Sequence, residues 1–143
     1  MSTPLYNAEI LRLASTIPHH ARLPAPMASA ERRSPICGSR VIVDVDVDDA
    51  GRVQAVGLLV RACALGQAAA SLLAAEVMGR TPAELATARD ALTNWLAGEG
   101  AAPQWPGLAI FEPALAHSAR HPSIRLAFEA AAEAAETAAR ARN

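Results

Sequence analysis

The chain has 143 residues and a net charge of −1 at pH 7, with 13 basic and 14 acidic side chains. Nucleic acids and anionic membranes favour a basic surface, so we expect neither as a partner. All of the basic residues are arginine. The absence of lysine excludes Schiff-base catalysis and any phosphate loop that needs a lysine. The length fits a single domain over residues 1–143.

The sequence has no apolar run of the roughly 20 residues that span a bilayer, and Met1 to Tyr6 lack the basic-then-apolar pattern of a signal peptide. We therefore expect a cytoplasmic location. In a reducing compartment, the two cysteines, Cys37 and Cys63, are more typically free thiols or metal ligands than a disulfide. Two unrelated buried thiols are the alternative.

The first third of the chain predicts a helix and a connector. Apolar residues recur at helical spacing over residues 4–16, and Pro18 ends the pattern. Residues 18–35 contain four prolines and predict an extended connector with at most a short edge strand. Within it, His19 and His20 are interpreted as part of a solvated loop, because adjacent residues rarely direct both imidazoles to one metal ion.

Two strands follow the connector. Residues 40–48 alternate between valine and mostly aspartate, which predicts a half-buried strand whose Asp44, Asp46 and Asp48 form a solvent-exposed face. The pattern lacks the glycine and the glutamate of a calcium loop. A turn at residues 49–51 and a return strand over residues 52–60 complete an antiparallel hairpin.

The hairpin brings the two cysteines to one end of the sheet, since Cys37 precedes its first strand and Cys63 follows its second. Cys63 also begins a helix predicted over residues 64–78, and a helix N-terminus favours a thiolate. Arg40 and Arg61 add positive charge nearby. We therefore interpret Cys63 as reactive or metal-binding, with an inert buried cysteine as the alternative.

The C-terminal half is predicted to be helical. Thr81 to Glu84 form a capping box that opens a helix, and Trp105 in the following loop is expected to be a packing anchor. A short helix is expected from Pro113 to Ser118, and a last helix from Pro122 with a fraying, alanine-rich end. His117 and His121 flank the junction between these two helices. The predicted buried residues of the capped helix are Leu85, Ala88, Leu92, Trp95 and Leu96.

The order of elements predicts an α+β fold, an antiparallel sheet of about three strands with helices packed on one side. The chain resembles the U-type iron–sulfur cluster scaffold family, which includes the N-terminal domain of NifU, IscU and SufU, and it is closest in pattern to the extended SufU-type branch. The expected fold is therefore SufE/NifU-like. The resemblance rests on Leu5-Tyr6 before the first helix, Pro35-Ile36-Cys37-Gly38, Arg61-Ala62-Cys63-Ala64 and Gly79-Arg80-Thr81.

This resemblance implies a scaffold that takes sulfur from a cysteine desulfurase, holds a labile iron–sulfur cluster of the 2Fe–2S type, or less readily zinc, and passes it to apo iron–sulfur proteins. The family site has three cysteines and an aspartate. Cys37 and Cys63 match two of them, Ser39 stands at the aspartate position and Ser123 at the third cysteine. His121 is an imaginable third ligand.

Several alternatives remain open from the sequence. Cys63 is a candidate persulfide carrier, which would make the chain a sulfur-relay protein or a small sulfurtransferase enzyme. A metal-free module that docks on or regulates a cysteine desulfurase is another reading. The sequence does not decide between a monomer and a homodimer, or whether the protein is an enzyme.

Overall fold

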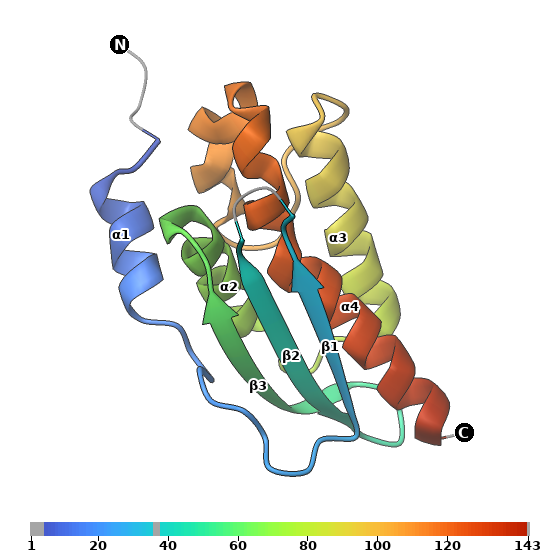
Figure 1. Cartoon of the computed structure of the whole chain (residues 1–143). Coiled ribbons are helices and arrows are strands. Elements are labelled where there is room, and N and C mark those ends of the chain that lie inside the picture. Colours follow the sequence, from blue (N-terminus) through green and yellow to red (C-terminus); the bar gives the residue numbers. More distant parts are fainter. Residues whose placement is uncertain (1–4, 36–37, 143) are drawn as a thin grey trace.

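The computed structural model describes residues 5–35 and 38–142 as an α+β fold with one three-stranded sheet (Figure 1). The predicted fold class is confirmed. Helices α2 and α4 pack against the sheet, α1 lies against α2 and α3 lies against α4. Among the described residues, no helix is long and apolar enough to cross a membrane. The elements are α1 (Ala8–Ser15), β1 (Ala28–Arg33), β2 (Arg40–Val47), β3 (Val53–Arg61), α2 (Ala64–Glu76), α3 (Pro82–Leu96), the 3₁₀ helices η1 (Leu108–Ala116) and η2 (Ser118–Arg120), and α4 (His121–Arg142).

Strand β2 is the centre of the sheet and pairs antiparallel with β1 and β3. Its alternate valines, from Val41 to Val47, are fully buried. They share a face with Arg32, which pairs with Val41 and reaches Glu133 on α4 at 2.9 Å. This face of the sheet is therefore the one that α2 and α4 cover.

The connector between α1 and β1 covers part of the opposite face and the outer edge of β3. A Cβ atom on Gly57 would lie 2.3 Å from the carbonyl oxygen of Ala21, so the connector backbone crosses the sheet at this glycine. Leu58 N donates to His19 O at 2.9 Å, and Val60 N donates to His20 Nε2 at 3.3 Å. Both histidines are exposed, and the expected short edge strand is β1.

The predicted solvent-exposed aspartate face of β2 is wrong. The Asp44 side chain is fully buried and accepts hydrogen bonds from the Arg22 guanidinium at 2.6 and 3.0 Å, from Leu23 N at 3.0 Å and from the Ser29 hydroxyl at 2.5 Å. Asp46 accepts a hydrogen bond from Met27 N at 2.8 Å. The alternating pattern predicts burial from the sequence of one strand only. Here the connector supplies hydrogen-bond donors that replace water around the two carboxylates.

The helical core follows the sequence closely in α3. The capping box between Thr81 and Glu84 is present, and the buried residues of α3 are those predicted. Trp105 is a packing anchor as expected, since its indole N–H donates to Leu72 O at 2.9 Å and its ring meets Phe128 edge-on at 5.3 Å.

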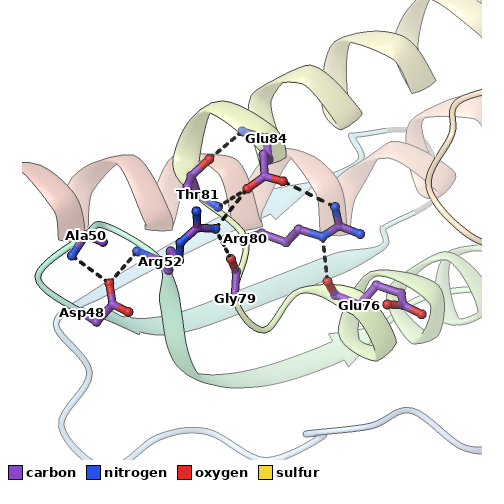
Figure 2. A network of polar contacts seen from close by, with 8 residues as sticks. All are labelled: Asp48, Ala50, Arg52, Glu76, Gly79, Arg80, Thr81 and Glu84. Carbon is purple, nitrogen blue, oxygen red and sulfur yellow. Dashed lines mark hydrogen bonds and ion pairs between the residues drawn. The ribbon is translucent and has the colours of Figure 1, made fainter.

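A polar network fastens the turn after β2 to the junction between α2 and α3 (Figure 2). Arg52 donates to Gly79 O at 2.9 Å and lies 3.7 Å from a Glu84 carboxylate oxygen. Arg80 lies 3.6 Å from the other oxygen and donates to Glu76 O at 3.0 Å. Its guanidinium also lies 4.6 Å from the centre of the Trp105 ring. The network is at the opposite end of β3 from Cys63.

Two predictions for the C-terminal part are corrected. The helical segment expected from Pro113 begins earlier, at Leu108, and is a 3₁₀ helix with Pro113 inside it. The alanine-rich end expected to fray is helical as far as Arg142, and its inward-facing alanines are buried as far as Ala138. Because alanine is only weakly hydrophobic, it gives little periodic signal in the sequence. Its small side chain nevertheless lets a helix pack closely against a sheet.

We predict that Asp44→Asn lowers the free energy of unfolding by about 1–3 kcal/mol at pH 7, because it weakens charge-assisted hydrogen bonds to a buried carboxylate. Burial by itself raises the pKa of Asp44, but the hydrogen bonds from Arg22, Ser29 and Leu23 outweigh it and leave this pKa below its ordinary value. The stability that this group contributes is therefore present above the unfolded pKa of about 3.9 and is lost as the pH falls through the folded pKa.

Urea unfolding of wild type and Asp44→Asn from pH 7 to pH 3 checks this. The difference in stability should shrink below about pH 4. Asp90→Asn is the control, since the Asp90 side chain is 64% exposed and its ion pair with Arg89 should contribute little. An equal difference at all pH values would contradict the role of the Asp44 charge.

Candidate functional site

Cys63 lies where β3 ends and α2 begins. It is the N-cap residue of α2, with an extended backbone at φ −67° and ψ 171°, and it is half-buried. The backbone therefore places its side chain at the helix N-terminus, as predicted. Cys37 lies outside the described residues. On either side of it, Ser34 N donates to Ser39 O at 2.9 Å and Gly38 N donates to Ser34 O at 3.1 Å.

Three side chains from three different elements meet at this point. The Cys63 thiol donates to Ser123 Oγ at 3.4 Å, and Ser123 Oγ lies 2.8 Å from Ser39 Oγ. Ser39 precedes β2 and is 3% exposed, while Ser123 is in the first turn of α4 and is 1% exposed. The first turn of α4 is thus docked at Cys63.

Gly66 allows this approach. It is in the first turn of α2, and a Cβ atom there would lie 2.7 Å from Ala62 Cβ and 3.2 Å from Ser123 O. Sequence reasoning missed this residue. A glycine inside a helix lowers stability by roughly 1 kcal/mol relative to alanine, so its presence there usually has a packing reason. The glycine in the predicted helix was therefore the available signal for a close backbone contact.

The spacing of Cys63 and Ser123 is compatible with two ligands of one small metal ion. Two ligands of one tetrahedral zinc ion, a thiolate and an oxygen, are roughly 3.5 Å apart, which is close to the observed 3.4 Å between Cys63 Sγ and Ser123 Oγ. A neutral hydroxyl is a weak ligand for iron or zinc, however. Over residues 5–35 and 38–142, no group of three or more Cys, His, Asp or Glu side chains is arranged to hold a metal ion.

The histidines near the site are placed differently from each other. His121 is 8% exposed, and its Nε2 lies 2.8 Å from Ala114 O. Nδ1 is therefore the ring atom that would have to bind a metal, and the assignment of His121 as a ligand stays a prediction. His117 is exposed.

Arginines gather at the same end of the sheet. Arg40 and Arg33 both donate to the Glu31 carboxylate, the former at 3.1 Å. The hydrogen bond from Arg33 and then that from Arg40 hold the pKa of Glu31 below its ordinary value. Arg61 is exposed two residues before Cys63. Glu31 offsets part of the charge of these arginines, and their effect on Cys63 stays a prediction.

Comparison with solved structures places the chain in a family. It superposes on the crystal structure of a nitrogen-fixing NifU-like protein (N-terminal) from Brucella abortus with a TM-score of 0.89 and 38% sequence identity over 94% of both chains. A putative iron–sulfur cluster assembly scaffold protein for the SUF system from Fervidobacterium islandicum matches with a TM-score of 0.83 and 17% identity, over 92% of this chain and 96% of that one.

A hypothetical protein has the same fold, with a TM-score of 0.76 and 21% identity over 90% of this chain and 95% of the other. No family model and no curated protein matches the sequence. The chain thus has the fold of the cluster scaffolds, with three antiparallel strands and packed helices, and it is 38% identical to the NifU-like protein. The chain belongs to the U-type iron–sulfur cluster assembly scaffold family.

We predict that Gly66→Ala moves the first turn of α4 away from Cys63, because the new methyl group meets Ala62 and the Ser123 backbone. In a Cys37→Ser background, alkylation of Cys63 by iodoacetamide should become several-fold faster as Ser123 withdraws from the thiol. Ala75→Gly, at an exposed position of the same helix, is the control. It should lower stability by roughly 1 kcal/mol without changing the alkylation rate. Equal rates in all variants would contradict the close contact.

Proposed function

We propose that this chain assembles a labile iron–sulfur cluster at Cys37 and Cys63 and passes it to apo iron–sulfur proteins in the cytoplasm. The observation that supports this most directly is the meeting of Cys63 with Ser123, in the first turn of α4, which in turn contacts Ser39, just before β2. The 38% identity to a NifU-like protein supports the scaffold role. Cluster type, sulfur donor and acceptors are part of the proposal.

The donor set favours transfer over storage. Cysteine thiolates are the usual ligands of iron–sulfur clusters, and this chain has two of them. Ser123 Oγ accepts a hydrogen bond from the Cys63 thiol and would donate one to a thiolate, but a hydroxyl group binds iron weakly. A cluster held by Cys37 and Cys63 would need water, His121 or a second copy of the chain to complete its ligands, and it would leave readily.

Sulfur relay is a second candidate, favoured by the hydroxyl of Ser123 beside the Cys63 thiol. The Cys63 thiolate would attack the terminal sulfur of a persulfide on a cysteine desulfurase. The sulfur–sulfur bond of the donor breaks, a new one forms on Cys63, and the donor cysteine leaves as a thiolate. Ser123 would donate a hydrogen bond to the sulfur atoms carried by Cys63. A Cys63 that gains no sulfur mass after incubation with a desulfurase and cysteine would exclude this.

Anaerobic reconstitution with iron and sulfide tests the main proposal. We expect the wild type to bind iron and sulfide in equal amounts with visible charge-transfer absorption, and Cys37→Ser and Cys63→Ser each to lose both, because two thiolates are the minimum that holds the cluster. Iron, sulfide and zinc are counted per chain. A wild type that binds no iron contradicts the proposal, and loss in one variant alone contradicts a two-cysteine site.

We also predict that Ser123→Cys lengthens the lifetime of bound metal at least about tenfold, because a thiolate replaces a hydroxyl next to Cys63. The loss of zinc and of reconstituted cluster to a chelator measures this. Ser71→Cys is the matched control, since Ser71 is also buried and in α2 but donates to Thr16 O. Equal lifetimes in the two variants would show that Ser123 does not stand at a ligand position.

A further inference from the structure

The sheet ends beside Cys63 in a row of three arginines, one from each strand. Arg33 of β1 pairs with Arg40 of β2, and Arg40 pairs with Arg61 of β3. Residues directly opposite in a sheet share a face. Because Arg32 reaches Glu133 of α4 on the covered face, its neighbour Arg33 lies on the other one. The row is therefore on the face that α2 and α4 leave uncovered, at the end of the sheet where β1 and β3 finish (Figure 1).

The charge of the row is only partly balanced. Glu31 contacts Arg33 and Arg40, whose side chains are 67% and 34% exposed. Arg61 is exposed, and its side chain has no hydrogen-bond or ion-pair partner within the part of the chain that the structure describes. Three cations with one carboxylate leave a net charge of +2. Like charges directly opposite in a sheet are destabilising, so an anionic partner on this row would relieve a repulsion that the free chain retains.

The connector makes the two ends of this face different. It crosses the sheet over Gly57 and supplies partners to the acidic part of β2. Asp44 forms an ion pair with Arg22, and Asp46 accepts a hydrogen bond from Met27 N. The connector contacts β3 as far as Val60, where His20 accepts a hydrogen bond. Arg61 is the next residue and Cys63 follows it by two. The acidic groups Asp44 and Asp46 of this face thus have partners, while Arg33 and Arg61 at its basic end are exposed.

We propose that Arg33, Arg40 and Arg61 form a docking surface for the carboxylate-bearing face of the protein that delivers sulfur to Cys63. The inference rests on the proposed function, since it names the surface by which that site meets its donor. Cys63 is half-buried, so a donor cysteine can reach it only when the donor protein contacts the surface around Cys63. Complementary charge on that surface speeds encounter and fixes orientation. The partner chemistry is an acidic protein surface.

The test measures binding of a cysteine desulfurase from the same organism, and the rate of sulfur transfer to Cys63, at low and high salt. Arg61→Glu should weaken binding roughly tenfold at low ionic strength and reduce the salt dependence, because the charge acts mainly on association. Arg61→Gln should have a smaller effect in the same direction. Arg140→Glu makes the same charge change on an exposed position near the end of α4 and should leave binding within about twofold.

Equal binding by wild type and Arg61→Glu, or equal weakening by Arg140→Glu, overturns the docking surface. The proposal is also overturned if Arg61→Glu binds the desulfurase as the wild type does but delivers clusters more slowly to an apo-protein. The arginine row would then bind the acceptor protein and not the sulfur donor. Binding to RNA in place of the desulfurase would also overturn it. These outcomes are separate from reconstitution: a chain that binds the desulfurase through Arg61 but holds no cluster would refute the proposed function and leave this inference standing.

Discussion

The contact between α4 and the central strand sets the geometry of the whole molecule. The inward-facing valines of β2 and the alanines along α4, including Ala127, Ala131 and Ala134, are buried almost completely. Small side chains on both sides let the helix lie close to the sheet. Because a 22-residue helix is stiff, fixing its middle also fixes its first turn. Ser123 comes to Cys63 as a consequence of packing many residues away.

The connector before β1 has a second organising role. Its polar groups cover the part of the β2 face that the sequence predicts to be solvent-exposed. Asp44 lies there fully buried, at the centre of a cluster of charge-assisted hydrogen bonds. The same segment covers the edge of β3, which removes unpaired backbone groups from solvent. A sheet of three strands thereby exposes charge at one end of one face, beside the candidate site.

The chemistry at Cys63 differs from that of a closed metal site. A structural zinc site surrounds its ion with strong ligands, and such sites hold metal permanently. Here the thiol contacts a hydroxyl that is itself bound to a second hydroxyl. Hydroxyl groups orient and stabilise sulfur without competing for iron. A carrier that must give up its cargo gains from such a donor set, and this links the local geometry to the scaffold family.

The sequence by itself determined the element order, the hairpin, the capped helix α3 and the position of Cys63 at a helix start, because periodicity, turn residues and caps act between neighbours in the chain. It also determined, through resemblance, which positions to compare with a cluster site. Tertiary structure alone decided that Asp44 is buried, that His121 directs Nε2 to Ala114, that Gly66 admits Ser123, and that three arginines form one row. Each of these depends on contacts between segments distant in sequence, which no local pattern encodes.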